Sequence, residues 1–485
     1  MKKIKMFIAF MLAAVILSGC NQGKTHDPID TVGGSQETEP VKLTQGIPSD
    51  VRYDNKPFRL VSVAGTWMAD KWENYDLENM DVVKRANYDR LVAVEERLGI
   101  KFDVILTGAV DPGDMIRRSV GAGDDEYDYV TARASWIRNT LFEGLYLDVD
   151  DLPYVDIDKP WWNKDYMQSV SLKLDDPTIL FGSINHTSVQ RSVSTVFNVE
   201  LLEKVHHLSP DDMYELVWNG EWTLDKFSEL CKGAYLDTNG NTIADKDDVF
   251  SLIHPEFNSV DYMAFGAGLS FTERDSEGFP RLSLNNERTV ELIEKLLKIY
   301  NDTAEVFEGE NSTSCFELFG AGKSMFYIER FLALEKDVIR ASDVEYGIIP
   351  VPKLDEAIDG YITPVGPLVD WGVVPKTVQD PEMVSAVIEL MAYIGYEEVI
   401  PAYYEIALKL KYTRGDDVDT ASRIIDLITE NQRTDFLAVN SLGGMEKIFK
   451  KIVSSGQNTF SSTYASLEEA ANAKLAVYLG SYYEN

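Results

Sequence analysis

The sequence predicts an α/β protein built from two lobes. The chain has 485 residues, which is more than one hydrophobic core usually supports. Hydrophobic residues make up 45% of the chain and charged residues 26%, as in ordinary globular proteins. Strand and helix patterns alternate soon after residue 57, which is typical of a parallel sheet covered by helices on both faces. We therefore expect two α/β lobes.

The first 20 residues predict an export signal. Three lysines precede an apolar run over residues 6–17, which is too short to span a bilayer comfortably. The run ends in Leu17-Ser18-Gly19-Cys20, which resembles the lipobox of bacterial lipoproteins. That resemblance implies cleavage before Cys20 and attachment of lipid to its thiol. The alternative is an ordinary signal peptide that is cut nearby.

The expected signal peptide occupies residues 1–19, and a flexible tether follows over residues 20–50. The tether is rich in Gly, Thr, Gln, Glu, Pro and Ser and cannot bury enough apolar surface to fold. Two or three acyl chains anchor a protein stably. We therefore expect a folded body held on the outer face of the cell membrane, in a cell with either one or two membranes.

The charge of the chain limits its partners. The formal net charge is -34, and such a surface repels nucleic acid. After residue 20 no apolar run is long enough to span a membrane. Neutral or cationic ligands suit this average charge better than anionic ones, although a local pocket can overrule the average.

The beginning of the folded body predicts a βαβαβ unit. Alternating apolar residues predict strands, helical spacing of apolar residues predicts helices, and Gly99 supplies a helix C-cap. We expect strands over 58–64, 100–106 and 127–131, with helices over 81–98 and 114–120. Ligands bind beyond the carboxyl ends of strands in open α/β sheets.

The passage into the second lobe is expected near residues 179–198. The remaining strands are expected over 179–183, 194–198, 324–328, 346–350 and 369–374. The remaining helices are expected over 199–204, 223–235, 285–300, 331–339 and 381–395, and the chain from there to residue 485 has a helical pattern, with a final helix from Ser466. Thr223 is the expected N-cap of its helix.

Three further stretches complete a recognisable order along the chain. They are Trp218–Phe227, Phe319–Phe326 and Tyr346–Lys353. With the lipobox, the tether and the opening βαβαβ unit, their order resembles the extracellular solute-binding proteins of family 1, the lipoprotein subunits of bacterial ABC importers. The resemblance covers nearly the whole mature chain, and the order of the motifs is what makes it specific.

The resemblance implies a type II periplasmic-binding-protein fold, in which two lobes are joined by a hinge of two or three crossings. Lobe one would be residues 57–185 plus 358–402, and lobe two residues 186–357 plus 403–485. The implied function is to capture a carbohydrate, commonly an oligosaccharide, as a monomer and to deliver it to the permease subunits of an ABC importer. Closure of the lobes on the ligand is a hinge motion.

The candidate ligand-binding residues are aromatic and polar side chains near predicted strand ends or loops. Sugar rings present flat C–H faces that pack on indole and phenol rings, while carboxylates and amides hold their hydroxyls. The candidates are Trp67, Trp136, Trp161, Trp162, Trp371 and Tyr404, with the polar partners Asp128, Arg133, Arg330 and Asp370. Trp136 and Trp371 are favoured among them. The alternative for each aromatic residue is packing in the core.

One loop has the spacing of a calcium site. Oxygen-bearing side chains fall at positions 1, 3, 5, 9 and 12 of a twelve-residue loop, and a backbone carbonyl is available at position 7, as in an EF-hand. These residues are Asp237, Asn239, Asn241, Asp245 and Asp248, with Ile243 at position 7. The loop departs from the pattern because Thr242 replaces Gly at position 6 and Asp replaces Glu at position 12. We expect structural Ca²⁺ and no other cofactor; the alternative is a solvated turn.

The sequence does not predict an enzyme. It has no GxSxG, no HExxH and no GxGxxG after the opening strand. With 80 acidic residues, paired carboxylates arise by chance and carry no weight. Two alternatives to a carbohydrate-binding protein stay open: a secreted carbohydrate-active enzyme, and a binding lipoprotein for a non-sugar ligand such as a peptide.

Two cysteines remain in the folded body. Cys231 lies in an apolar helical stretch, which favours a small buried thiol. A disulfide between Cys231 and Cys315 is compatible with an oxidising compartment, and the sequence alone does not decide between these states.

Overall fold

A computed structural model of the protein describes residues 46–63, 80–108, 110–184, 186–255, 258–302, 304–409 and 418–484. The chain from Gln45 to Asn485 forms one compact unit. The expected signal peptide, Cys20, most of the tether and Trp67 lie outside the described residues. In the part of the chain that is described, no helix is both long and apolar enough to cross a membrane.

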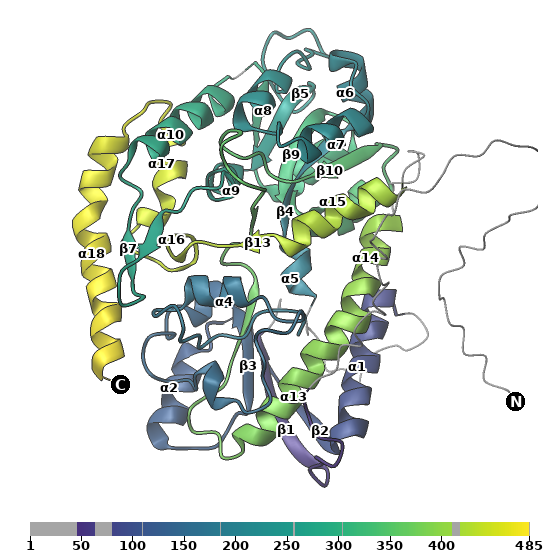
Figure 1. The fold of residues 1–485 in the computed structure, drawn as a ribbon. Helices are drawn as coiled ribbons and strands as arrows, with labels where there is room; N and C mark the ends of the chain where they lie inside the picture. The colour runs from purple at the N-terminus through teal and green to yellow at the C-terminus, as the bar shows by residue number, and fades with distance from the viewer. Residues whose placement is uncertain are drawn as a thin grey trace, which may run out of the picture. The chain divides into compact units, whose positions relative to one another are not determined.

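The first sheet has four strands in the order β12-β3-β1-β2 (Figure 1). These strands are β1 (Lys56–Val63), β2 (Ile100–Thr107), β3 (Tyr129–Arg133) and β12 (Asp370–Val373). β1 pairs in parallel with β2 and β3, and β12 runs antiparallel to β3. The predicted βαβαβ unit is confirmed, and a strand from much later in the chain completes its edge.

Local sequence explains where the first long helix begins and ends. In α1 (Val82–Leu98), the Asp81 side chain accepts a hydrogen bond from the backbone N–H of Lys84 at 2.8 Å, which caps the start of the helix. Gly99 ends the helix with a φ of 63°, a conformation that glycine adopts without strain. The helix packs against β2 and beside α13 (Pro381–Ile394).

The other elements around the first sheet are short, except for one continuous helical stretch. They are α2 (Gly113–Ala122), α3 (Ala134–Ile137), the 3₁₀ turn η2 (Val149–Asp151) and α4 (Lys164–Val170). The helix α13 continues through the π-turn η4 (Gly395–Val399) into α14 (Ile400–Lys409). Because α14 contacts both α1 and the turn η3 (Phe331–Glu335), this stretch links the two halves of the compact unit.

The second sheet has five strands in the order β10-β4-β9-β5-β8. They are β4 (Val193–Asn198), β5 (Phe250–Pro255), β8 (Val306–Gly309), β9 (Ser324–Arg330) and β10 (Tyr346–Ile349). β5 is parallel to β8 and β9, while β4 runs antiparallel to both β9 and β10. Each sheet therefore mixes parallel strands with one reversed strand.

Helices surround the second sheet (Figure 1). Their bounds are α5 (Thr187–Gln190), α6 (Val199–His206), α7 (Pro210–Trp218), α8 (Leu224–Leu230), α9 (Asn258–Gly266), α10 (Glu287–Tyr300), α11 (Ser312–Gly320), α12 (Asp337–Arg340), α15 (Val418–Glu430), α16 (Phe436–Val439), η5 (Met445–Lys447), α17 (Ile448–Ser454) and α18 (Phe460–Glu484). Trp222, Phe227 and Phe326 form an aromatic cluster in the core beneath them. Trp222 has no exposed surface, and its Nε1 donates to the carbonyl of Pro350 at 2.8 Å.

The chain passes between the two sheets three times. It leaves the first sheet after β3 for β4, returns from β10 to β12, and leaves again through α14. A short parallel pair, β11 (Thr363–Pro364) with β13 (Gln432–Arg433), lies on this route. A separate hairpin is formed by β6 (Thr272–Arg274) and β7 (Pro280–Leu282).

Some sequence expectations about elements are wrong. Residues 179–183 form isolated bridges, Leu180 with Gly372 and Trp162 with Gly182, because pairing does not extend along the segment. The helix capped by Thr223 ends at Leu230 rather than residue 235, and Cys231 forms its C-cap. Over residues 331–339 a 3₁₀ turn precedes the short helix α12, and the last helix begins at Phe460.

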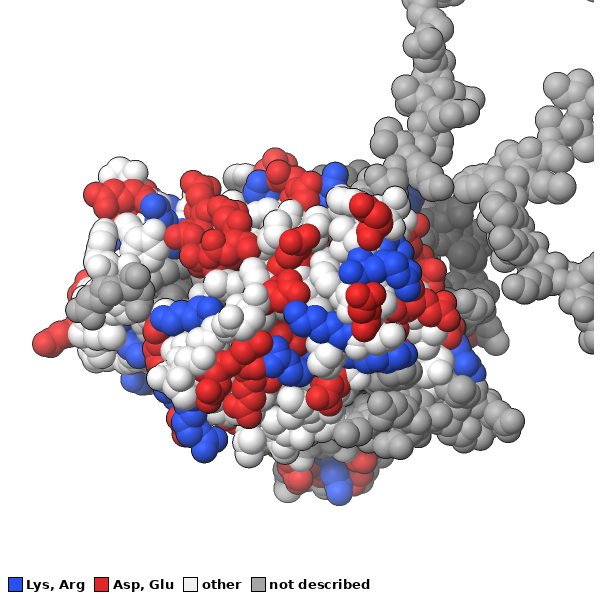
Figure 2. All heavy atoms as spheres, turned by 90° about the horizontal axis from the view of Figure 1, so that it is seen from below, with Lys and Arg blue, Asp and Glu red and all other residues white. Residues whose placement is uncertain are grey.

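Acidic and basic side chains are mixed on the surface. On the face seen in Figure 2, basic side chains stand among acidic ones rather than gathering in a single patch. Some of them form local ion pairs, such as Lys56 with Asp380, at 2.8 Å, and Arg117 with Glu143, at 2.6 Å. Exposed pairs of this kind add little stability.

Candidate functional site

A cavity of about 440 Å³ opens where strand ends of the two sheets meet; we call it the cleft pocket. The first sheet contributes the segment over 364–369 that leads into β12, and the second sheet contributes the end of β9. Its charged and polar lining residues are Arg138, Arg191, Asp261, Ser312, Arg330, Thr434, Glu446 and Lys447. Tyr262, Phe265 and Pro367 add flat or apolar surface.

Backbone register brings charged residues together at this edge. Arg133 ends β3 and pairs directly with Asp370 at the start of β12. Arg330 ends β9 and pairs with Val193, two residues after Arg191. Burial lowers the pKa of Arg191, and the nearby charges of Arg330 and Arg133 lower it further, while Asp370 opposes them. The two sheets therefore bring three guanidinium groups into one electrostatic neighbourhood.

The hydrogen bonds of these arginines differ. Arg330 donates from Nε to the buried carboxylate of Glu329 at 2.5 Å, and Arg138 donates to the carbonyl of Val439 at 2.7 Å. The buried Nε atoms of Arg133, Arg138 and Arg191 have no hydrogen-bond partner among the described residues. Donors that are buried and unpaired are costly, so they indicate a site able to bind acceptor groups.

The two carboxylates of the cleft pocket, Asp261 and Glu446, differ from each other in their surroundings. Burial raises the pKa of Asp261 to about 7, an effect that the nearby Lys450 opposes. Glu446 accepts hydrogen bonds from the backbone N–H groups of Leu442 and Gly444, each at 3.2 Å. Asp261 is thus about half protonated near pH 7, and Glu446 is bonded to the backbone.

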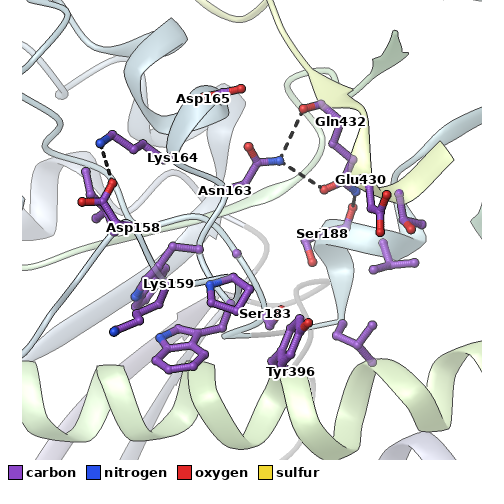
Figure 3. A pocket seen from close by; sticks show the side chains of 18 of the residues that line it. Asp158, Lys159, Asn163, Lys164, Asp165, Ser183, Ser188, Tyr396, Glu430 and Gln432 are labelled. Carbon is purple, nitrogen blue, oxygen red and sulfur yellow. Dashed lines mark hydrogen bonds and ion pairs between the residues drawn. The ribbon is translucent and has the colours of Figure 1, made fainter. Parts of the chain in front are cut away.

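A second cavity, also of about 440 Å³, lies beside the segments that cross between the sheets; we call it the hinge pocket (Figure 3). It shares no lining residue with the cleft pocket. Its lining comes from residues 157–165, 182–183 and 188–189, from η4 and α14, and from the end of α15 and β13. The close-up shows Asn163 directed towards Gln432 and Lys164 turned to Asp158.

The polar groups around the hinge pocket are bonded to one another. Trp161 and Trp162 donate from Nε1 to the two carboxylate oxygens of Glu389, at 2.9 and 2.8 Å. Burial raises the pKa of Glu389 to about 7, although both indole donors oppose the shift. Gln432 donates from Nε2 to the carbonyl of Ser188 and to Oγ of Ser192. This network fastens the crossing segments together.

Some of the predicted ligand-binding residues lie at the cleft pocket and others at the hinge pocket. Arg330 lines the cleft pocket, while Arg133 and Asp370 lie at the neighbouring strand ends. Trp161, Trp162 and Tyr404 line the hinge pocket instead. Tyr404 donates its hydroxyl to Thr429 at 2.8 Å.

Three further candidates have different environments. Trp136 is partly exposed in α3, and the Arg133 guanidinium lies 5.4 Å from the centre of its ring, a cation–π distance. Trp371 has no exposed surface and donates from Nε1 to the hydroxyl of Tyr166 at 3.2 Å, so in this structure it packs in the core. Asp128 precedes β3 at its amino end and forms a buried ion pair with Arg59, away from the carboxyl ends of the strands.

Sequence reasoning missed Arg191, Arg138 and Tyr262 in the cleft pocket, and Glu389 behind the hinge pocket. Arg191 directly follows the short helix α5 and precedes β4 by two residues, so a basic residue near a predicted strand was the available signal. Glu389 lies within a helix that is buried nearly all round. A lone carboxylate in such an apolar helix is a sequence signal for a buried polar network.

The predicted calcium loop folds as a series of tight turns. The carboxylate of Asp237 accepts from the backbone N–H groups of Gly240 and Thr242 at 2.7 and 2.9 Å. Thr242 adopts a φ of 64°, the left-handed conformation for which an EF-hand loop uses glycine at this position. Throughout the described ranges, however, no three His, Cys, Asp or Glu side chains lie close enough together to hold a metal ion.

The two described cysteines are both buried and are not bonded to each other. Burial raises the pKa of the Cys315 thiol to about 12 and that of Cys231 still further. Both thiols are therefore protonated and inert at neutral pH, as small apolar side chains.

Comparison with known proteins identifies the fold. No family model matches the chain, and no curated protein matches it in sequence. The structure is similar to that of a cyclo/maltodextrin-binding protein complexed with maltotetraose, with a TM-score of 0.58 and 13% identity over 87% of this chain and 98% of that one.

Two further solved structures give the same result. The sugar-binding protein MalE from Xanthomonas citri has a TM-score of 0.57 and 12% identity over 89% of this chain and all of that one. An ABC substrate-binding protein from Listeria monocytogenes in complex with cycloalternan has a TM-score of 0.52 and 12% identity over 87% of this chain and 99% of that one. The predicted fold is confirmed: this chain has the two-lobe α/β fold of these sugar-binding proteins.

Proposed function

We propose that this chain is an extracellular solute-binding protein that captures an oligosaccharide and delivers it to the permease subunits of an ABC importer. The observation that carries the proposal is the cleft pocket, which opens at the strand ends of both sheets. Ligands of open α/β sheets bind at such ends. The structurally similar proteins named above bind maltotetraose and cycloalternan, which supports a carbohydrate.

The composition of the cleft pocket suits a sugar. Guanidinium groups and hydroxyls are donors for sugar hydroxyls, and Tyr262 and Phe265 offer ring faces on which C–H surfaces pack. A ligand that contacts both sheets stabilises the closed arrangement of the lobes, because it contacts both sheets only in that arrangement. The three crossings of the chain are the hinge about which such closure occurs.

We propose binding without turnover, by a monomer. The test is a thermal-shift screen of the compact unit Gln45–Asn485 against oligosaccharides, monosaccharides and peptides. A ligand that binds only the folded state raises its stability by about 2.7 kcal/mol at a hundred times its dissociation constant. A shift with a glycan that is recovered intact supports the proposal. A shift with peptides alone, or products from the glycan, would overturn it.

The lipid anchor on Cys20 is part of the proposal. Its support is the sequence Leu17-Ser18-Gly19-Cys20 after a short apolar run. Labelled palmitate supplied to growing cells is expected to enter the wild-type chain and to be absent from Cys20→Ala, which should also leave the membrane fraction. Membrane retention and labelling of Cys20→Ala would refute the anchor.

We also propose that the loop from Asp237 to Asp248 binds structural Ca²⁺. The left-handed conformation of Thr242 supports the proposal, because the turn that the loop requires is already present. Asp237, Asn239, Asn241, Asp245 and Asp248, with the carbonyl of Ile243, would hold the ion. Calorimetry with CaCl₂ should show one site that Asp237→Ala abolishes. No heat of binding, with no change in melting temperature on adding EDTA, would refute the site.

A further inference from the structure

The cleft pocket concentrates positive charge on a strongly acidic chain. The whole chain has a formal net charge of -34. The pocket lining nevertheless has four cationic side chains and two carboxylates, and Arg133 lies just beyond it. The cations are Arg138, Arg191, Arg330 and Lys447. Cationic side chains therefore outnumber carboxylates in the lining itself, while Glu329 pairs with Arg330 and Asp370 lies at the same edge as Arg133.

Several arginines among the described residues are paired with carboxylates. Arg59 holds Asp125 and Asp128, and Arg288 holds Glu291 and Asp355. Arg191, by contrast, forms no ion pair with any described residue, and its buried Nε has no hydrogen-bond partner there. The charge of the nearby Asp370 opposes the cost of burying this cation, which has no direct ion pair among the described residues.

Neighbouring positive charges repel the guanidinium group of Arg191. Burial and the charges of Arg330 and Arg133 lower the pKa of Arg191 and so disfavour its cation, although Asp370 opposes them. An anion bound among these three groups would relieve their repulsion. Binding to an arginine in a site shielded from water is strongest when the acceptor is a planar carboxylate, which accepts two parallel N–H donors.

We propose that the carbohydrate of the cleft pocket is acidic: a uronic-acid oligosaccharide whose carboxylate binds Arg191, with Arg133 and Arg330 on either side. This inference rests on the proposed carbohydrate-binding function and narrows its substrate class. Tyr262, Phe265 and Pro367 are the surfaces for the sugar rings. The two carboxylates of the lining do not fully offset the charge of the arginines. Glu446 is bonded to the backbone, and Asp261 is about half protonated near pH 7.

The test compares matched sugars that differ only in charge. Trigalacturonate and trimannuronate are titrated into the unit Gln45–Asn485, each beside its neutral methyl ester, with maltotriose and cellotriose as neutral glycans. We expect at least one acid to bind about tenfold to a hundredfold more tightly than its ester, the range for losing a hydrogen bond to a charged group. Because salt screens the attraction between opposite charges, a higher salt concentration should weaken the binding of the acidic sugar. The binding of neutral glycans should not change.

Variants locate the carboxylate. Arg191→Gln should remove the preference for the acid over its ester, and Arg191→Lys, which keeps the charge but not the two-donor geometry, should restore part of it. Arg281→Gln is the matched control, because Arg281 lies on the hairpin strand β7, exposed and paired with Glu273. It should bind like the wild type.

The possible failures are distinguishable. Equal binding of acid and ester, or a preference for the acid that survives in Arg191→Gln, would overturn the acidic-sugar inference. Binding of neutral glycans alone would overturn it too, while leaving the carbohydrate-binding function intact. A chain that binds peptides and none of these glycans would overturn both.

Discussion

The hinge pocket and the cleft pocket have the same volume, about 440 Å³, but opposite hydrogen-bonding states. Around the hinge pocket, Glu389 holds two indoles and Gln432 holds two serines. Around the cleft pocket, buried guanidinium nitrogens of Arg138 and Arg191 have no partner among the described residues. Satisfied groups stabilise a fold by themselves, whereas unsatisfied ones are stabilised only when something binds. We therefore propose that the hinge pocket stabilises the fold and that the cleft pocket binds the ligand.

The largest effect expected is on stability, from truncating an indole at the hinge pocket. Trp161 has no exposed surface, packs edge-on against Tyr393 and donates to Glu389. Trp161→Ala should lower the free energy of unfolding by about 3–5 kcal/mol, measured by urea denaturation. Trp136→Ala is the control, and because Trp136 is partly exposed, it should cost much less. An equal loss of unfolding free energy in both variants would contradict a structural role for the hinge pocket.

The next effect concerns the carboxylate beneath the two indoles. Glu389→Gln replaces one acceptor oxygen by a donor group and leaves one indole N–H unpaired, which should cost about 1–3 kcal/mol. Folding raises the pKa of Glu389 to about 7 from an ordinary value of 4.5. Its contribution to stability is therefore fully present below pH 4.5 and is lost as the pH rises through about 7.

Urea denaturation at about pH 5 and about pH 8 measures this contribution. The wild type should lose about 2.5 kcal/mol more than Glu389→Gln over that interval. The difference between the two proteins is thus expected to be largest at the lower pH. Parallel pH profiles would show that Glu389 titrates normally and that the indole network does not depend on its charge.

The smallest effect on stability is expected in the cleft pocket. Arg191→Gln removes a half-buried cation that has no ion pair in the described chain, so the free energy of unfolding should change by less than about 1 kcal/mol. Arg59→Gln is the contrasting variant, because it leaves Asp128, which is 1% exposed, without its partner. That should cost about 3–5 kcal/mol. A large loss in Arg191→Gln would make Arg191 a structural residue.

Local patterns predicted much of the fold. The strands β1, β2 and β4 and the helix caps at Gly99 and Thr223 follow from signals within a few residues of each other. The strand β5 was missed because all six of its residues are buried, so it shows no alternation of apolar and polar residues. Likewise, the isolated bridges at 179–183 depend on what lies beside them rather than on their own sequence.

The candidate site was harder to predict, because its contacts join distant parts of the chain. Strand-end reasoning found Arg133, Arg330 and Asp370, which share the carboxyl edge of the sheets. It favoured Trp371 as a binding residue, yet that indole is buried against Tyr166, 205 positions away in the sequence. Whether an aromatic side chain is buried depends on such distant partners, and one sequence does not show them.

The most direct test of the account is a crystal structure of the unit Gln45–Asn485 with the oligosaccharide that most raises its melting temperature. The account predicts sugar density in the cleft pocket, in contact with Arg191 and Arg330 and against the ring of Tyr262. Density in the hinge pocket instead, between Trp162 and Tyr404, would contradict it. In that case the satisfied network around Glu389 would be part of the binding site rather than the fastening of the hinge.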